Sequence, residues 1–495
     1  MSKSIKLNNK NLSLLPDEVI KPGYDRSKIK TGIVHIGVGG FHRSHQAFYT
    51  DEFLKLTGET SWGICGISLL DKDLDMYNAL VQQDGLYTLM YNEPDGRLSA
   101  RIIGSIVEYY FAPGNQEQVI EKMAHRDVKI ITLTITEGGY NFDEATGEFL
   151  IGKQSVQWDL KNPQYPKTVF GFLTEAFKRR MNRGTGGLTI QSCDNIQHNG
   201  GIAKKMLYAY LDEADPDLKE WVEKNISFPN SMVDRITPVT TPAEIENIKT
   251  IYGIIDSKPV VCEPFYQWII EDGFIRGRPA WELAGAQFVS DVTPYEKLKI
   301  RIINGGHSAL GFTGYLLGHA YVHEAAGDPV VKKFLKEFFD EEVTPVLDPV
   351  PGLDIEEYKS IALKRFENPF IKDNLTRILS ESSAKIPKFI IPTIKEQLER
   401  GGSVLRSAIV IAAWCHYLER SGTSGNNYEI QDKNKEILLA GSKSSVKNNT
   451  LDFLKIDTIF GDLVSYEHFV SAYLLIINKL RKFGIKSVLT QLTRN

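Results

Sequence analysis

A lysine, an asparagine and a histidine occur at a spacing suited to acid–base chemistry. They are Lys299, Asn304 and His307, in the segment YEKLKIRIINGGHSAL over residues 295–310. The apolar residues of this segment predict a helix, and at about 100° per residue the three polar side chains project within an arc of about 140°. A desolvated lysine can accept a hydroxyl proton once its pKa falls below about 10.4. Taken alone, the segment also fits a solvent-reaching lysine, a capping asparagine and a core histidine.

Two glycines and a second asparagine extend this pattern. Gly305 and Gly306 each cost roughly 1 kcal/mol in a helix relative to alanine, which predicts close approach of another backbone or a ligand. Asn195 and its neighbour Asp194 follow a predicted strand, where open α/β sheets bind ligands. Amide donors that converge on one oxygen would stabilise an alkoxide, so the set suits alcohol oxidation. The sequence has no H-E-x-x-H and no cysteine–histidine cluster with ligand spacing, so no metal is expected.

A glycine-rich turn predicts a nucleotide site near residue 40. In HIGVGGFHR, residues 35–43, Gly37 and Gly39 end a β-branched run, followed by Gly40 and Phe41. Free N–H groups at such a turn stabilise a pyrophosphate. His42 replaces the third glycine of the G-x-G-x-x-G fingerprint, so the turn also fits one that only lets a strand and a helix pack.

The next predicted strand, residues 63–68, leads into LLDKD. Asp71 and Asp73 stand where an acid would bind a ribose 2′-hydroxyl, and we take Asp73 as the cofactor contact. Lys72 between them could instead accept a 2′-phosphate. NAD is therefore preferred and NADP is not excluded. The alternative is that the three residues form a solvated helix start.

The elements that carry these residues change character along the chain. Short apolar runs near residues 32–41, 63–68, 128–136, 188–193 and 259–265 alternate with helical stretches, which predicts a doubly wound, mostly parallel α/β sheet. After about residue 291 helical periodicity dominates. We expect two domains, over residues 1–290 and 291–495. The polar run 441–450 is expected to be a surface loop.

Composition excludes several classes of protein. The 495 residues are 42% apolar and 24% charged, with a net charge of −4, so neither a disordered chain nor a nucleic-acid or membrane binder is expected. No stretch approaches the roughly 20 apolar residues of a membrane span. Four cysteines without paired spacing fit a reducing compartment, so we expect a cytoplasmic protein.

Long stretches of the chain resemble the polyol-specific long-chain dehydrogenases, the mannitol dehydrogenase family. The stretches are GIVHIGVGGFHRSH (32–45), TLTITEGGY (132–140), SCDNIQHNG (192–200), SMVDRITP (231–238), CEPFYQWIIEDGF (262–274), RPAWELAGAQFVSDV (278–292) and KFIIPTIKEQL (388–398). The family pattern K-x4-N-x2-H is complete in Lys299, Asn304 and His307. The resemblance implies a Rossmann-like dinucleotide-binding domain followed by an α-helical substrate and catalytic domain.

The resemblance also implies roles for individual residues. Lys299 would be the general base, Asn195 and Asn304 the oxyanion hole, and His307 the group that orients the substrate. Asp234 and Arg377 would line the polyol pocket. Glu296 would lie near the proton exit route. For Asp234 and Arg235 a buried structural ion pair is the alternative.

The expected reaction is the metal-independent interconversion of D-mannitol and D-fructose with NAD. Fructuronate reductases of the family often carry an Arg-Glu pair where this chain has Gln197 and His198, which favours an uncharged polyol over a sugar acid. The alternatives are a fructuronate reductase, an arabinitol dehydrogenase or, more distantly, a non-catalytic dinucleotide sensor. The expected partner is a small polyol or ketose. The oligomeric state is open, and a monomer is compatible with the sequence.

Overall fold

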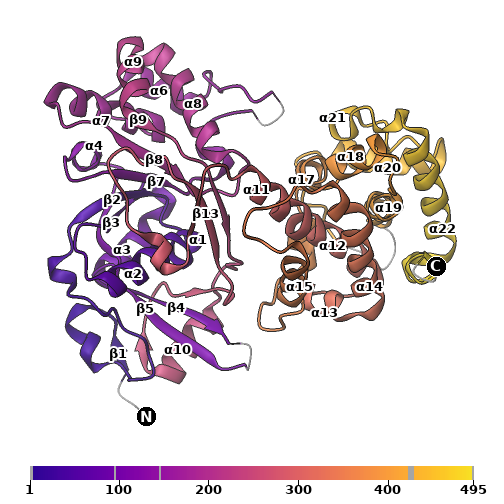
Figure 1. Cartoon of the computed structure of the whole chain (residues 1–495), viewed down its shortest axis with the longest axis horizontal. Coiled ribbons are helices and arrows are strands. Elements are labelled where there is room, and N and C mark those ends of the chain that lie inside the picture. The colour runs from indigo at the N-terminus through magenta and orange to yellow at the C-terminus, as the bar shows by residue number, and fades with distance from the viewer. Residues whose placement is uncertain (1–3, 94–95, 144–145, 422–427, 493–495) are drawn as a thin grey trace. The chain divides into compact units, whose positions relative to one another are not determined.

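The computed structural model describes residues 4–93, 96–143, 146–421 and 428–492. The chain divides into two compact units, Met1–Val292 and Thr293–Asn495. The first contains β-sheets and helices, and the second has helices and no β-strand among its described residues (Figure 1). No helix of the described residues is long and apolar enough to cross a membrane.

The main sheet of the N-terminal unit is parallel and, within the described residues, has six strands. In spatial order they are β6 (Ile106–Phe111), β3 (Gly63–Ser68), β2 (Thr31–Ile36), β7 (Ile130–Leu133), β8 (Leu188–Ser192) and β9 (Ile226–Ser227). Numbered along the chain, this order is 3-2-1-4-5-6, which is that of the Rossmann fold. The order reverses between β2 and β7, so ligands are expected at the carboxyl ends of these two strands.

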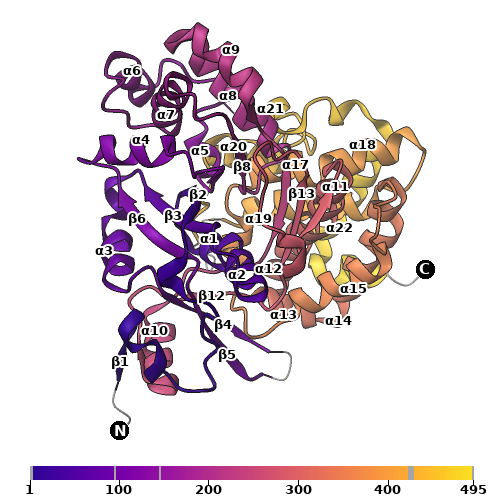
Figure 2. The same cartoon turned by 60° about the vertical axis from the view of Figure 1, so that its left-hand side comes forward.

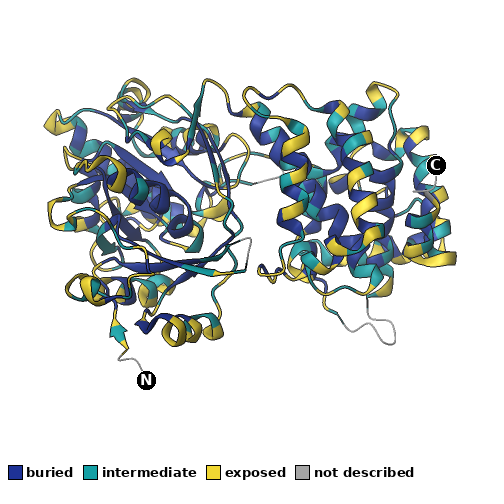
Figure 3. Cartoon of the chain, turned by 60° about the horizontal axis from the view of Figure 1, so that its bottom comes forward, coloured by how far each residue is buried: buried dark blue, intermediate teal, exposed yellow. Residues whose placement is uncertain are grey.

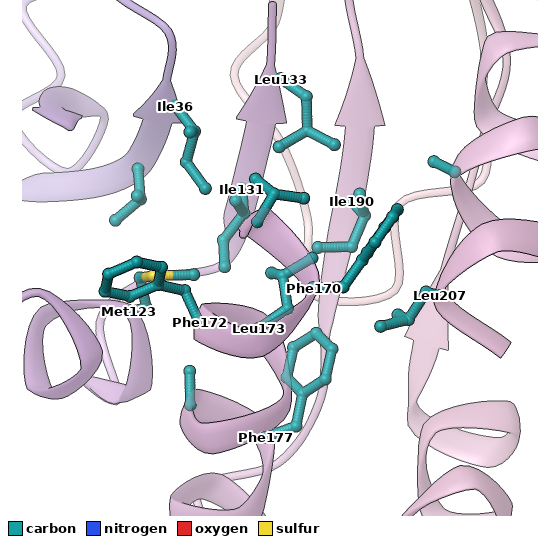
Figure 4. Close-up of a cluster of buried hydrophobic side chains, with 14 of the residues drawn as sticks. Ile36, Met123, Ile131, Leu133, Phe170, Phe172, Leu173, Phe177, Ile190 and Leu207 are labelled. Carbon is teal, nitrogen blue, oxygen red and sulfur yellow. The ribbon is translucent and has the colours of Figure 1, made fainter. Parts of the chain in front are cut away.

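Alternate residues of the strands pack on opposite faces of this sheet. Ile36, Ile131 and Ile190 point into a core formed with α4, α7 and α8, where Phe170 and Leu173 lie against them (Figure 4). Ile33 belongs to the core on the other face, with residues of α2. Burial on both faces explains why the strands read as continuous apolar runs.

Along the chain, helices lie between successive strands of the main sheet, and α10 follows β10 (Ser231–Asp234). They are α1 (Gly40–Ser44), α2 (Gln46–Thr57), α3 (Leu74–Gln82), α4 (Gln116–Ala124), α5 (Thr136–Gly139), α6 (Gln154–Lys161), α7 (Val169–Arg183), α8 (Asn199–Ala214), α9 (Pro216–Asn225) and α10 (Pro242–Tyr252).

Three smaller sheets accompany the main one. They contain β12 (Val260–Val261) with β4 (Tyr87–Asn92) and β5 (Leu98–Ile103); β10 (Ser231–Asp234) with β13 (Gln267–Glu271) and β14 (Gln287–Val289); and β1 (Ile5–Lys6) with β11 (Ile254–Ile255). The hairpin of β4 and β5 shares a hydrophobic core with α10 (Figure 2). The run near residue 259 was predicted as a strand of the doubly wound sheet. It forms β12 instead, which pairs with β4.

The C-terminal unit is a set of packed helices. They are α11 (Thr293–Lys299), α12 (Gly305–Leu317), α13 (Val322–Gly327), α14 (Pro329–Glu337), α15 (Ile355–Phe366), α16 (Leu375–Leu379), α17 (Ser382–Phe389), α18 (Ile391–Glu399), α19 (Leu405–Arg420), α20 (Lys435–Lys447), α21 (Asp457–Phe460) and α22 (Glu467–Leu492), with the π-helices η5 (Ile300–Asn304) and η6 (Phe338–Val343). Most show one buried and one exposed face, whereas α19 is buried along most of its length (Figure 3).

The predicted loop over residues 441–450 is wrong, because α20 extends to Lys447. Ser442 and Ser445 are buried on this helix. The Ser442 hydroxyl donates to the Leu439 carbonyl, and Arg481 donates to the Ser445 hydroxyl at 2.9 Å. Hydrogen-bonded serines can occupy a buried helix face, which the polar composition of the segment concealed.

Candidate functional site

The glycine turn lies at the carboxyl end of β2, beside that of β7. Gly37 has a φ of +97°, and a Cβ there would lie 2.1 Å from the carbonyl oxygen of Thr134, so only glycine fits. Gly39 differs, because a Cβ on it would approach no described atom more closely than 3.9 Å. Gly37 is therefore required by the turn, while Gly39 leaves the main chain accessible, as close approach of a pyrophosphate requires.

Helix α1 begins at Gly40 directly after this turn. His42, at the position of the missing third glycine, forms a stacked pair with His35. The His42 ring stacks on the His35 ring of β2 with centroids 3.4 Å apart, and both side chains are buried. His35 contacts the hydroxyls of Thr132 and Thr134 at 2.7 and 2.9 Å. Burial lowers the pKa of His35 to about 3 and that of His42 well below its usual value. Two neutral imidazoles thus pack α1 on β2.

The Phe41 ring of the same segment is half-buried and stacks on the His45 ring, with centroids 4.9 Å apart. His45 separates α1 from α2, and its Nε2 donates to the carbonyl oxygen of Gln267 on β13 at 2.8 Å. The hydrogen bond of His45 therefore connects the segment after the turn to the sheet that contains β13.

The acidic segment after β3 forms a short 3₁₀ helix over Asp71–Asp73. Asp71 and Lys72 are exposed, whereas Asp73 is half-buried. Near it, the hydroxyl of Tyr109 lies 2.8 Å from the Ser68 hydroxyl, and burial raises the pKa of Tyr109 to about 12. A neutral hydroxyl pair and a carboxylate therefore stand at the carboxyl end of β3.

The loop after β8 is fixed by Asp194. This buried carboxylate accepts hydrogen bonds from the N–H groups of Ile135 and Thr136, at 3.0 and 2.8 Å, and from the Tyr140 hydroxyl at 2.7 Å. Burial raises its pKa to about 6. Asn195 follows directly and its side chain is exposed. Because β8 neighbours β7, Asn195 lies at the same edge of the sheet as the glycine turn.

Asp234 is the buried last residue of β10. This strand is joined to the end of β8, because the Ser231 hydroxyl donates to the Ser192 carbonyl at 2.7 Å. Arg235 beside it donates to the main-chain carbonyls of Glu263 and Ser44, at 3.1 and 2.6 Å. These bonds give Arg235 a structural role and hold α1 against the neighbouring strands.

In the C-terminal unit, the helix predicted over residues 295–310 is not a regular α-helix. α11 ends at Lys299, the π-helix η5 follows, and α12 begins at Gly305. The Gly305 N–H donates to the carbonyl of Ile300, five residues back. Each residue of a π-turn sweeps a smaller angle than one in an α-helix. Lys299 and Asn304 therefore lie closer around the helix axis than the α-helical spacing predicted.

The spacing K-x4-N thus matches one π-turn, a feature found frequently at functional sites. His307 lies on the first turn of α12, with its ring centroid 4.4 Å from that of Phe366. Asn304 is half-buried, and no described group hydrogen-bonds its Oδ1. The C-terminal unit therefore brings Lys299, Asn304 and His307 onto one continuous helical segment.

Another main chain approaches Gly305, as predicted, whereas Gly306 packs against aromatic side chains and not against the predicted backbone or ligand. A Cβ at Gly305 would lie 3.3 Å from the carbonyl oxygen of Phe389, and one at Gly306 would lie 2.8 Å from the Phe339 ring. Phe389 is the last residue of α17, and Phe339 lies on η6.

An ion-pair network anchors η5 to α18. Glu396 pairs with both Lys297 and Arg301, at 3.0 and 2.7 Å, and Arg301 also donates to the Thr393 hydroxyl at 2.6 Å. Lys299 and Glu296 are buried, three residues apart on α11 and so on adjacent positions of one face. The network restrains the segment that carries both residues.

Arg377 lies on α16 with 65% of its side chain exposed, and its Nε donates to the buried Asp373 at 2.6 Å. Lys385 on α17 was missed by the sequence reasoning. Its amine donates to the Ile378 carbonyl at 3.0 Å, and burial, followed by the charge of Arg377, lowers its pKa to about 8. Proline and isoleucine around Lys385 are the signal of burial that the sequence offered.

Comparison with known proteins assigns both units to one family. Residues 31–283 match the mannitol dehydrogenase Rossmann domain, and residues 291–483 match the mannitol dehydrogenase C-terminal domain. The mannitol 2-dehydrogenase of Neosartorya fischeri is 44% identical, with 98% of each chain covered.

Two solved structures share the fold over nearly the whole chain. The Pseudomonas fluorescens mannitol 2-dehydrogenase ternary complex with NAD and D-mannitol is 41% identical, with a TM-score of 0.88 over 99% of this chain and 100% of that one. A substrate-free D-sorbitol dehydrogenase is 35% identical, with a TM-score of 0.91 over 98% and 100% of the two chains. The chain therefore belongs to the mannitol dehydrogenase family.

Proposed function

We propose that this protein is a mannitol 2-dehydrogenase that interconverts D-mannitol and D-fructose with NAD. The observation that carries the proposal is the likeness to mannitol 2-dehydrogenases over 98% or more of the chain, at 41–44% identity. The N-terminal unit would bind the dinucleotide and the C-terminal unit would carry the substrate chemistry.

The residues of the N-terminal unit fit a dinucleotide. Gly37 shapes the turn at the point where the strand order reverses, and Gly39 and Gly40 leave its main chain open. Phe41 would pack beside the turn, and Asp73 would accept from a ribose hydroxyl. When bound, NAD supplies the hydride acceptor for the carbon that is oxidised.

Proton transfer is assigned to Lys299. We propose that its neutral amine takes the proton of the C2 hydroxyl as that carbon becomes a carbonyl, and returns it in the reverse direction. Lys299 is buried on α11, and an amine must be neutral to accept a proton. Glu296, one helical turn earlier, would pass this proton toward solvent.

The amides of Asn195 and Asn304 would donate to the oxygen on the reacting carbon, and stabilise the charge that develops there. His307 would orient the substrate, while Asp234 and Arg377 would bind its other hydroxyls. This set supplies both a base and charge stabilisation from side chains, so the proposal needs no metal. Dialysis against a chelator should leave the rate unchanged, and a loss restored by a divalent cation would contradict metal independence.

A substrate panel tests the assignment. The purified protein is incubated with NAD and D-mannitol, D-sorbitol or D-arabinitol, and with NADH and D-fructose or fructuronate, while nicotinamide absorbance is followed. We expect the highest kcat/KM for the D-mannitol and D-fructose pair, and a higher kcat/KM with NAD than with NADP. D-sorbitol is included because of the sorbitol dehydrogenase likeness. Dominant turnover of fructuronate or another polyol would overturn the assignment.

A further inference from the structure

A run of polar residues behind the glycine turn is buried. The five residues that follow Phe41, His42 to Gln46, have almost no exposed surface, and Arg43 among them is only 4% exposed. Arginine is rarely buried unless it is paired, so its partners indicate what this one does.

The donors of Arg43 end on main-chain carbonyls. Its Nε donates to Gly39, at 3.2 Å, and its own N–H donates to the same Gly39 oxygen at 3.2 Å. Nη1 donates to the carbonyl of Lys258, just before β12. Tyr87 of β4 donates to the Arg43 carbonyl at 2.6 Å. Arg43 therefore connects the glycine turn to the sheet of β4 and β12.

The guanidinium of Arg43 forms no direct ion pair with any residue that the structure describes. Among the described residues no carboxylate lies within ion-pair distance of Arg43, whereas buried Arg101 pairs with Asp51 and Glu52. Asp256 is the carboxylate that acts on Arg43 electrostatically. The Asp256 carboxylate accepts hydrogen bonds from the N–H groups of Thr88 and Lys258, at 2.6 and 2.9 Å, and from the Gln83 amide at 2.9 Å.

A buried cation without a direct ion pair is costly, and an anion that binds nearby offsets part of that cost. Within a trans peptide the C=O and the next N–H point in opposite directions. Because the Gly39 carbonyl accepts from the Arg43 side chain and main chain, the Gly40 N–H of the same peptide points away from Arg43.

We propose that Arg43 is the positioning residue of the nucleotide turn: it fixes the Gly39–Gly40 peptide for the cofactor pyrophosphate and adds positive charge beside the turn. This inference rests on the proposed function, since it requires a dinucleotide at the turn.

Binding of ADP-ribose, which contains the pyrophosphate, and of adenosine, which lacks it, tests this role by calorimetry on the full chain. Arg43→Met removes the charge, and Arg43→Lys keeps the charge but cannot bridge both carbonyls. We expect the Kd for ADP-ribose to rise about 100-fold in Arg43→Met and about 10-fold in Arg43→Lys, with the Kd for adenosine little changed. The KM for NAD should rise in the same order, with a smaller effect on kcat.

Arg180 provides matched controls. It is also a buried arginine of this unit whose donors end on carbonyls, those of Gly186, His125 and Gly187, each at 2.9 Å. Arg180→Met and Arg180→Lys should lower stability without changing the ratio of the two Kd values. If the Arg43 variants keep the wild-type ratio, or change it no more than the Arg180 variants, the inference is wrong while the proposed function stands. If the wild-type protein binds neither ADP-ribose nor NAD, the proposed function itself fails.

Discussion

Replacing His45 should change how the stability of the protein depends on pH. The Nε2–H of this buried imidazole donates to the Gln267 carbonyl, and its Nδ1 has no hydrogen-bond partner among the described residues. Burial, with a smaller contribution from Arg235, lowers its pKa to about 4. Glutamine can donate the same hydrogen bond from its amide and does not titrate in this range, so His45→Gln isolates the proton.

The sign and size follow from linkage. A folded-state pKa of about 4, against about 6.5 in the unfolded chain, means that the neutral form favours folding. The stability from His45 is complete above pH 6.5 and is lost as the pH falls toward 4. Between pH 7 and pH 4 this loss is about 3 kcal/mol, which His45→Gln does not suffer.

The assay is urea unfolding of wild type and His45→Gln from pH 7 to pH 4, followed by fluorescence. The difference between their free energies of unfolding should shift by about 3 kcal/mol in favour of the variant as the pH falls. Comparing the two proteins removes the opposite effect of Asp194, whose raised pKa favours folding at low pH. His125→Gln, at an exposed histidine, is the control substitution. A pH-independent difference for His45→Gln would refute the reasoning.

Four further substitutions separate stability from chemistry. Gly37→Ala should lower the melting temperature, because its Cβ would meet the Thr134 carbonyl. Gly39→Ala should keep the wild-type melting temperature and weaken NAD binding. Equal melting temperatures for the two variants would contradict this expectation. Asn304→Ala should reduce kcat by about 10²–10³ with little change in the Kd for NAD, and an unchanged kcat would exclude Asn304 from the oxyanion hole. Glu342→Gln should reduce the free energy of unfolding by about 2 kcal/mol, because the buried carboxylate accepts from the N–H groups of Arg406 and Ser407 at the start of α19. Urea unfolding measures this change, and a variant as stable as wild type would contradict it.

The fold class could be predicted because its signals are local. Apolar runs such as those of β2 and β8 are long enough to identify central strands, and helical periodicity marks the C-terminal unit. The partner of a short strand is not a local property. β12 has two residues, and only the structure shows that it pairs with β4.

The segment that carries Lys299, Asn304 and His307 is harder to predict. The residue types of Lys299, Asn304 and His307 could be recognised from the sequence. Their relative directions depend on η5, where the main-chain hydrogen bonds span five residues instead of four, and no residue pattern marked this change. The packing of Gly305 and Gly306 against α17 and η6 likewise involves residues distant in sequence. His42 illustrates the same point, because its stacking on His35 could not be read from a missing glycine.

We propose that Lys299 is the base of a mannitol-oxidising enzyme, and the turnover of lysine variants tests this role. NADH formation from D-mannitol and saturating NAD is followed for wild type, Lys299→Met and Lys395→Met, a surface control that pairs with Asp462. We expect Lys299→Met to reduce kcat by about 10²–10⁴ while the Kd for NAD stays within about a factor of two, and Lys395→Met to behave as wild type. A Lys299→Met protein that oxidises D-mannitol at the wild-type rate would exclude Lys299 as the base.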